Sequence, residues 1–274
     1  MRIVRYESNG QAQVGIQQED GLVLPTGIGD LADALRSGQP VTAQAGAAPV
    51  SVSRLLAPVA RPQKILCCGV NYTSHKEENP GAVLPTEPFF FSKLPSALIG
   101  PDDEIVKPDP ATQLDYEVEL ALVIGKRARH LSEDEAMSVV YGYTILNDVS
   151  ARDVQFTDNQ ITLGKGADTF CPLGPAVVTV DELPDPQAVT VSTVVNGEQR
   201  QHESTAEMLF PVTKLLAYLT RTVTLEPGDI VSTGTPGGVG YFMTSGMLEP
   251  GDKVEMEISG IGRLANPVVA GWAT

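Results

Sequence analysis

Cysteine is scarce in this 274-residue chain, and the three that occur, Cys67, Cys68 and Cys171, are an odd number. A disulfide framework uses an even number of cysteines at regular spacing, so this composition argues against one. The N-terminal stretch 1–10 also lacks the apolar segment of a secretory signal. A reducing compartment fits both observations, and we expect a cytoplasmic protein.

Positive charge is also scarce, because 19 Lys and Arg residues face 34 Asp and Glu residues and leave a formal net charge of −15. Proteins that bind nucleic acid or an anionic lipid surface present a basic face. No stretch approaches the roughly 20 consecutive apolar residues of a membrane-spanning helix. The sequence therefore predicts no nucleic-acid partner and no membrane partner, while its 42% apolar residues are enough for a folded core.

Turn-forming residues are abundant, and the 21 prolines and 26 glycines separate short β-branched runs. This pattern is typical of a strand-rich fold with many turns. A polar, Ala-rich stretch at Val41–Val50 leads to Arg61-Pro62, and we place a domain boundary near residue 60. We expect a small N-terminal domain at residues 1–60 and one large, mainly β domain at residues 61–274.

Local signals predict several individual elements. Asp30 can cap a helix over Leu31–Ser37 that Gly38 ends. The capping box Ser132-Glu133-Asp134-Glu135 predicts a helix running to about Tyr141. Asn196-Gly197 predicts a tight hairpin turn after a strand at Val189–Val195. The remaining expected elements are strands at Arg2–Tyr6, Gln13–Ile16, Leu22–Leu24, Lys64–Cys68, Asp115–Ile124 and Tyr143–Leu146, a helix around Val212–Leu219, and Pro-Gly turns at Glu226–Asp229 and Glu249–Asp252.

Two carboxylates lie in the expected strand Asp115–Ile124. Side chains alternate along a strand, so Glu117 and Glu119 share one face, and apolar residues on both faces indicate an interior strand. Burial and mutual repulsion disfavour two such charges, and a divalent cation with a preference for oxygen ligands removes the conflict. The alternative is a solvent-facing strand end, where paired acids cost little.

A third carboxylate follows the expected strand Tyr143–Leu146. Asp148 lies where this strand ends and a helical turn begins, which is a common location for active-site residues. Arg152 and Gln155 are three residues apart and therefore lie on one helical face. The alternative is that Asp148 only caps the helix.

Five ordered motifs occur over about residues 61–274. They are Gly69-Val70-Asn71-Tyr72-x-x-His75-x-x-Glu78, Tyr116-Glu117-x-Glu119-Leu120, Asn147-Asp148-x-Ser150-Ala151-Arg152-Asp153-x-Gln155, Leu163-Gly164-Lys165-Gly166 and Thr233-Gly234-Thr235-Pro236. Together these motifs resemble the fumarylacetoacetate hydrolase superfamily. This resemblance implies the mixed β-sandwich roll of that family's C-terminal domain, with a small N-terminal α/β appendage (a mainly β, α+β fold), a homodimer, and a bound Mg²⁺ or Mn²⁺, with Ca²⁺ as a crystallographic substitute.

The resemblance also implies roles for individual residues. The metal ligands are expected to be Glu117, Glu119 and Asp148. The catalytic residues are expected to be His75 and Glu78, which would activate water, and Lys165, which would stabilise an oxyanion. The substrate's oxygens are expected to contact Arg152, Gln155, Thr235 and, as a further anion-binding position, Lys93.

For function, the resemblance implies a metal-dependent hydrolase that cleaves a C–C bond in a small, anionic 2,4-diketo acid, of the acylpyruvate, fumarylpyruvate or diketo-deoxy sugar acid type. The same site also suits oxaloacetate decarboxylation or isomerisation of 2-hydroxyhepta-2,4-diene-1,7-dioate. A third reading, from another class, is a metal-stabilised binding protein without turnover.

Overall fold

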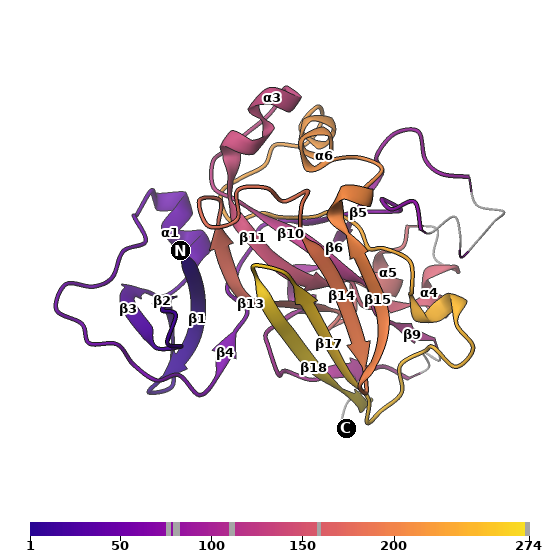
Figure 1. Ribbon diagram of the computed structural model, residues 1–274, viewed down its shortest axis with the longest axis horizontal. Helices are drawn as coiled ribbons and strands as arrows, with labels where there is room; N and C mark the ends of the chain where they lie inside the picture. Colours follow the sequence, from indigo (N-terminus) through magenta and orange to yellow (C-terminus); the bar gives the residue numbers. More distant parts are fainter. Residues whose placement is uncertain (75–77, 79–82, 110–112, 158–159, 272–274) are drawn as a thin grey trace.

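The computed structural model describes residues 1–74, 78, 83–109, 113–157 and 160–271. Two β-sheets form the body of the molecule, and short helices lie around their edges (Figure 1). This architecture confirms the mainly β fold expected from the sequence. Within the described residues, no helix is both long and apolar enough to cross a membrane.

The larger sheet contains the strands that carry the acidic residues of interest. Its central strand β10 is buried at every position, as expected for the interior strand that the apolar run indicated. Most neighbours pair antiparallel, while β16 pairs with β5 in parallel. The strand order is β3 (Val23–Ile28), β2 (Gln11–Gln17), β1 (Arg2–Ser8), β13 (Cys171–Thr179), β11 (Val140–Asn147), β10 (Val118–Ile124), β16 (Ile230–Ser232), β5 (Ile65–Cys68) and β6 (Phe90–Lys93), with β4 (Leu55–Leu56) beside β1 and β7 (Leu98–Ile99) beside β13.

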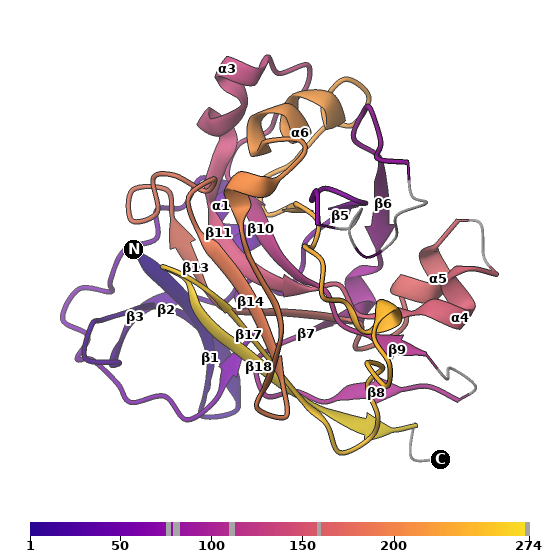
Figure 2. The ribbon, with the colours of Figure 1, turned by 45° about the vertical axis from the view of Figure 1, so that its right-hand side comes forward.

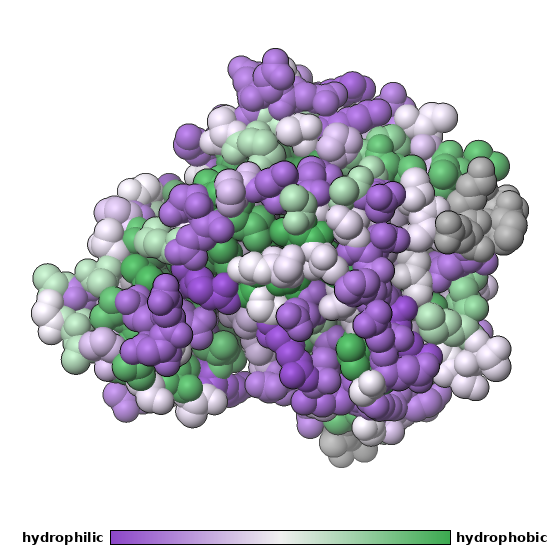
Figure 3. All heavy atoms as spheres, viewed as in Figure 1, coloured by the Kyte–Doolittle hydropathy of each residue, from purple (hydrophilic) through white to green (hydrophobic). Residues whose placement is uncertain are grey.

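The smaller sheet packs against the larger one. Its strands β14, β17 and β18 contact β10, β11 and β13, and Figures 1 and 2 show the orange and yellow strands lying against the magenta ones. This face of the molecule is mostly hydrophilic in the space-filling view, with some apolar residues among the polar ones (Figure 3). The strand order is β15 (Glu198–Ser204), β14 (Thr190–Val195), β17 (Lys253–Ile258), β18 (Gly262–Ala270) and β8 (Ile105–Lys107).

The N-terminal segment joins the larger sheet directly. Strand β1 pairs antiparallel with β13, with Arg2 opposite Val178 and Ile3 opposite Val177. Helix α1 (Leu31–Ser37) has the predicted bounds. The domain boundary near residue 60 stays a prediction, because hydrogen bonds between β1 and β13 place both segments in one sheet.

The remaining helices are short. Helix α6 (Val212–Leu219) has the predicted bounds, and it packs beside α3 (Glu133–Ala136). Near β6 and the end of β11 lie α4 (Arg152–Gln155) and α5 (Thr162–Lys165), which contact each other. The 3₁₀ turns are η1 (Pro95–Ala97), η2 (Met137–Val139), η3 (Thr205–Glu207) and η4 (Gly240–Phe242), and a two-stranded ladder pairs β9 (Leu114–Asp115) with β12 (Ser150–Ala151).

Two of the sequence predictions need correction. The helix expected from the capping box ends at Ala136 and continues only as η2, because the following Val140–Asn147 run enters the buried strand β11. The strand expected over Asp115–Ile124 is divided, since Asp115 belongs to β9 and β10 begins at Val118. Glu117 therefore lies at the junction between two strands rather than inside one.

Candidate active site

Three carboxylates meet where β10 begins and β11 ends. Each of Glu117, Glu119 and Asp148 offers one oxygen that lies within 4.8 Å of the others, and all three residues are buried. The antiparallel register places Glu119 opposite Leu146, and the amide of Asp148 donates to the carbonyl of Glu117 over 2.9 Å. Strand pairing therefore brings two separate chain segments to one point, as the family resemblance implied.

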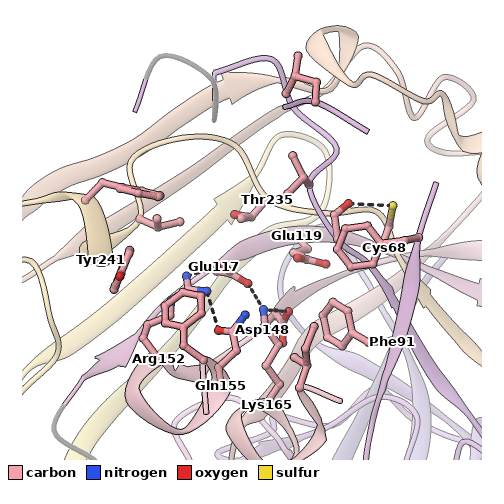
Figure 4. Close-up of a pocket in the computed structure, with 18 of the residues that line it drawn as sticks. Cys68, Phe91, Glu117, Glu119, Asp148, Arg152, Gln155, Lys165, Thr235 and Tyr241 are labelled. Carbon is pink, nitrogen blue, oxygen red and sulfur yellow. Dashed lines mark hydrogen bonds and ion pairs between the residues drawn. The ribbon is translucent and has the colours of Figure 1, made fainter. Parts of the chain in front are cut away.

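Two buried lysines pair with two of these carboxylates. Lys165 Nζ lies 2.5 Å from Glu117 Oε2 and 2.5 Å from Asp148 Oδ2, so its ammonium bridges them. Lys93 Nζ lies 2.6 Å from Asp148 Oδ1 and also donates to the Val149 carbonyl over 3.1 Å. Both oxygens of Asp148 therefore accept from an ammonium group, as Figure 4 shows for Lys165.

Arg152 is held by two carboxylates. Its Nη2 lies 2.6 Å from Glu117 Oε1 and 2.8 Å from Asp115 Oδ2, and its Nη1 donates to Gln155 Oε1 over 3.1 Å. Pairing of β9 with β12 sets Ser150 opposite Asp115, which brings the nearby Arg152 within reach. The expected helical pair of Arg152 and Gln155 is therefore present, and both side chains line the cavity described below.

Asp115 also anchors the loop that carries η4. Its carboxylate accepts from the amides of Gly240, at 2.7 Å, and Tyr241, at 3.1 Å, as well as from Arg152. Asp115 is fully buried. One side chain thus fixes both the arginine and the loop that lines the cavity.

Glu119 has different partners from the other two carboxylates. Its Oε2 accepts from the Ser232 hydroxyl at 2.5 Å and from the Gly234 amide at 3.2 Å. Gly234 has φ +91°, and a Cβ there would lie 2.8 Å from the Asn71 Cβ, so only glycine suits this approach. Among the described residues, no lysine or arginine forms an ion pair with Glu119.

The environments of Glu117 and Glu119 shift their pKa values in opposite directions. Burial raises the pKa of Glu119, and the Asp148 and Glu117 carboxylates raise it further, well above its ordinary value. Burial acts the same way on Glu117, but Arg152 and Lys165 outweigh it and hold the pKa of Glu117 below its ordinary value. Glu119 is therefore the member of the triad that has no Lys or Arg ion-pair partner among the described residues.

This arrangement suits a hard divalent cation. The Lys165 ammonium already lies between Glu117 and Asp148, which shows that these oxygens converge on a place for positive charge. Glu119 supplies a third oxygen nearby. Carboxylate oxygens favour Mg²⁺, Mn²⁺ or Ca²⁺ over softer metals, so the residues present fit the expected ion.

The carboxylates form the floor of a cavity of about 220 Å³. Its wall is largely apolar and includes an aromatic row, in which the Phe156 and Tyr241 ring centroids are 5.1 Å apart and those of Tyr241 and Phe242 are 5.2 Å apart. The polar lining residues are Glu117, Glu119, Asp148, Arg152, Gln155, Lys165 and Thr235, and the apolar ones include Val70, Leu84, Phe89, Phe91, Phe156, Val239, Tyr241 and Phe242.

The other expected site residues have mixed outcomes. His75 lies outside the described residues. Glu78 is described, and its Oε1 accepts from the Gly238 amide, but it is not among the residues that line the cavity. Lys93 reaches the site through Asp148, and Thr235 lines the cavity. The catalytic and substrate-binding roles of all these residues stay predictions.

Sequence reasoning missed three residues that organise the site. Asp115 directly precedes the motif containing Glu117 and Glu119, and this position was its only signal. Ser232 directly precedes the Thr233-Gly234-Thr235-Pro236 motif and contacts Glu119. Gln201 lies in β15, which is distant along the chain from the five family motifs, and no local pattern in the sequence indicates its role.

Comparison with known proteins identifies relatives of this chain. The sequence model of the fumarylacetoacetate (FAA) hydrolase C-terminal family matches residues 64–269. Human mitochondrial oxaloacetate tautomerase FAHD2A is 46% identical over 233 residues, which cover 84% of this chain and 74% of that protein.

Two solved structures show the same fold over the whole chain. A fumarylacetoacetate hydrolase from Exiguobacterium antarcticum is 39% identical with a TM-score of 0.89, covering 98% of this chain and 99% of that one. Maleylpyruvate hydrolase from Sphingobium sp. SYK-6, in complex with manganese(II) and pyruvate, is 30% identical with a TM-score of 0.82, covering 99% and 100%. The chain therefore belongs to the fumarylacetoacetate hydrolase superfamily.

Proposed function

We propose that this chain is a divalent-metal-dependent enzyme that interconverts the enol and keto forms of oxaloacetate or a closely related small 2-keto dicarboxylate. The observation that carries the proposal is the convergence of Glu117, Glu119 and Asp148 beside Lys165 and Arg152 at the floor of one cavity. The name of the human relative, an oxaloacetate tautomerase, supports this choice of substrate.

The three carboxylates would hold the metal ion, Mg²⁺ or Mn²⁺. A bound ion of this kind acts as a Lewis acid and stabilises negative charge that develops on a keto oxygen. Manganese in the maleylpyruvate hydrolase structure supports the class of ion. In this chain Glu119 would contribute a negative charge to the metal site, because its carboxylate has no Lys or Arg partner among the described residues.

The cationic groups would attract and orient the anionic substrate. The Asp148 and Glu117 carboxylates outweigh burial and raise the pKa of Lys165, so its side chain stays an ammonium. Because Lys165 lines the cavity, this ammonium can donate to a substrate oxygen. A net charge of −15 makes such local positive charge necessary for binding an anion.

Tautomerisation needs one proton moved between the 2-oxygen and C3 of the substrate, with no water consumed. The resemblance gives His75 and Glu78 as a pair that activates water, and in a tautomerisation the same pair would move this proton instead. This role stays a prediction because His75 lies outside the described residues. A pair of this type suits both directions of the reaction. The group that accepts the proton when the enol forms the ketone donates it in the reverse reaction.

The decisive assay follows the ultraviolet absorbance of enol oxaloacetate with purified protein, with Mg²⁺ or Mn²⁺ and with EDTA. We expect metal-dependent loss of the enol that is faster than the buffer rate, with no matching release of pyruvate. No acceleration with either ion would overturn the proposal. Stoichiometric pyruvate release would instead identify decarboxylation.

Hydrolysis of a C–C bond is the second candidate. The observation that favours it is the aromatic row of Phe156, Tyr241 and Phe242, which offers an apolar wall to the acyl part of an acylpyruvate. The maleylpyruvate hydrolase neighbour supports this reading. Release of acetate and pyruvate from acetylpyruvate, faster than enol conversion of oxaloacetate, would place hydrolysis first.

We also propose that the chain forms a homodimer, acts in the cytoplasm and has a small anionic keto acid as its partner. The names of several relatives specify mitochondria, so the compartment needs its own test. Light scattering after size exclusion should give twice the 29.1-kDa chain mass. Fractionation of cells that express the natural protein would locate it.

A further inference from the structure

Gln201 is the one fully buried residue of β15, a strand whose other described side chains are exposed or half-buried. Its amide makes four hydrogen bonds. Oε1 accepts from the Val118 amide at 3.2 Å and from the Thr193 hydroxyl at 2.9 Å. Nε2 donates to Thr235 Oγ1 at 2.8 Å and to the Pro236 carbonyl at 2.8 Å.

Two of these partners fix which way the amide points. The Val118 main-chain N–H can only donate, so it requires the oxygen of Gln201 on its side. The Pro236 carbonyl can only accept, so it requires the nitrogen on the other side. One hydrogen of the amide is used by Pro236, and the second is therefore directed at Thr235.

This orientation determines the role of the Thr235 hydroxyl. Because Thr235 Oγ1 accepts from Gln201, its own hydrogen is left to donate elsewhere. Among the described residues, the hydroxyl of Thr235 donates no hydrogen bond. Thr235 is 4% exposed and lines the cavity, and in the view of Figure 4 the carboxylates lie between it and Lys165. A nearly buried donor is thus left for a ligand on the side of the site opposite Lys165.

We propose that Gln201 is a positioning residue that holds the Thr235 hydroxyl as a hydrogen-bond donor to a carboxylate oxygen of the bound keto acid. The inference rests on the proposed function for the identity of the ligand. Gln201 also bonds to the amide of Val118, the residue between Glu117 and Glu119. One side chain from the smaller sheet therefore ties the substrate-binding loop to the acidic strand.

Glutamine is the side chain that performs both tasks. A carboxylate at position 201 would still accept from Val118, but it would also accept the Thr235 hydrogen and so turn the hydroxyl away from the ligand. The Thr235 oxygen would then face an anionic substrate as an acceptor only. Gln201→Glu therefore changes the polarity of this contact while it nearly keeps the shape of the side chain.

The test compares Gln201→Glu, Thr235→Val and the double variant with the unaltered enzyme. The matched control is Gln199→Glu, which makes the same change at an exposed position of the same strand. The readouts are kcat and KM for oxaloacetate, the Kd of oxalate by calorimetry with Mg²⁺ present, and the thermal midpoint. Gln201→Met, which removes the amide without adding charge, replaces the glutamate variant if that variant does not fold.

Each single variant should raise the KM and the oxalate Kd by roughly tenfold or more, with a smaller change in kcat, because one hydrogen bond to a charged group is lost. In the Thr235→Val background, Gln201→Glu should add less than about twofold, because the contact through which it acts is already gone. Gln199→Glu should leave all readouts near those of the unaltered enzyme.

Full additivity of the two substitutions, or an unchanged oxalate Kd in a folded Gln201 variant, would overturn the inference while leaving the proposed function intact. A loss of thermal midpoint with no change in KM would also overturn it, because that is the pattern of a purely structural residue. An unaltered enzyme that neither binds oxalate nor converts oxaloacetate would overturn the proposed function and this inference with it.

Discussion

Glu119 lies buried in surroundings that disfavour its negative charge. Its carboxylate is buried and accepts from Ser232 and Gly234, yet it lies beside two other carboxylates and has no ion-pair partner among the described residues. A buried charge without a partner is costly unless a cation is bound or a proton is taken up. The site therefore has a residue whose substitution should separate stability from function.

We predict that Glu119→Gln raises the thermal midpoint of the metal-free protein near neutral pH by a few degrees, an effect of about 1 kcal/mol. The amide keeps the shape and removes the disfavoured charge. The same variant should lose the stabilisation that Mn²⁺ gives to the unaltered protein. Thermal melts with EDTA and with Mn²⁺ measure both effects, and a variant still stabilised by Mn²⁺ as strongly as the unaltered protein would count against Glu119 as a ligand.

The raised pKa of Glu119 should make the stability of the metal-free protein depend on pH. Because the pKa of Glu119 is raised above its ordinary 4.5, the folded state holds this proton longer than the unfolded state does. Stability should therefore fall as pH rises from about 4.5 through the raised pKa. Urea melts across this range should show a shallower fall for Glu119→Gln, and equal slopes would contradict the assignment.

Asp115 is the residue whose loss should damage the architecture of the site most. Asp115→Asn removes the buried charge that pairs with Arg152 and weakens the contacts to the loop at Gly240. We expect the free energy of unfolding to fall by about 3–5 kcal/mol, as when one partner of a buried ion pair is removed. Urea unfolding measures it.

The control for this prediction is Glu226→Gln. Glu226 pairs with Arg127, whose side chain is 73% exposed, so the change should cost less than about 1 kcal/mol. Equal losses for both variants would contradict the account of Asp115 as the anchor of the site.

At the scale of elements, signals that act within a few residues predicted the structure well. Asp30 caps α1 through the Asp33 amide and Gly38 ends it at φ +69°, as expected. The hairpin between β14 and β15 turns at Asn196 and Gly197, which have φ +51° and +84°. In each case the contacts that form the cap or the turn lie between residues that are close together in the sequence.

The acidic strand shows where local reasoning fails. The alternation of side chains predicted one continuous strand. At its start, however, two main-chain amides donate to side chains instead of to a neighbouring strand: Glu117 to Asn147 and Val118 to Gln201. Asn147 and Gln201 come from other parts of the chain, and no periodic pattern in the sequence indicates these contacts. The family resemblance could therefore predict that Glu117, Glu119 and Asp148 meet, but local patterns could not predict how they are held.

The hairpin turn allows a direct test of a conformational requirement. Gly197→Ala should lower the free energy of unfolding by about 1 kcal/mol without affecting activity, because alanine disfavours the positive φ of this position. Gly29→Ala is the control, since Gly29 lacks a positive φ and a Cβ there meets no atom within 4 Å. Denaturant melts compare the two, and equal effects would contradict the role of the turn.

At the scale of the whole molecule, the larger sheet connects segments that are distant in sequence. No local signal predicted that β1 pairs with β13, because partners such as Arg2 and Val178 are far apart in sequence. Ile3 and Val4, both in β1, are buried in the interior. The N-terminal segment is thus part of the same hydrogen-bonded sheet as the strands that carry the site.

We predict that a chain lacking residues 1–60 is strongly destabilised or aggregates, because the deletion exposes the edge of β13 and the apolar surface under β1. Soluble yield and the urea midpoint measure this. A truncated chain that unfolds at the same midpoint as the full chain would show that the N-terminal segment is energetically independent.

The central claim is that Glu117, Glu119 and Asp148 bind one divalent cation at the floor of the cavity. The most direct measurement is an anomalous difference map from a crystal of the full chain grown with Mn²⁺ and oxalate. The account predicts one strong peak at about 2.0–2.6 Å from an oxygen of each carboxylate, with the Lys165 ammonium moved out from between Glu117 and Asp148. A map without a peak there, or with Lys165 still bridging the two carboxylates, would contradict it.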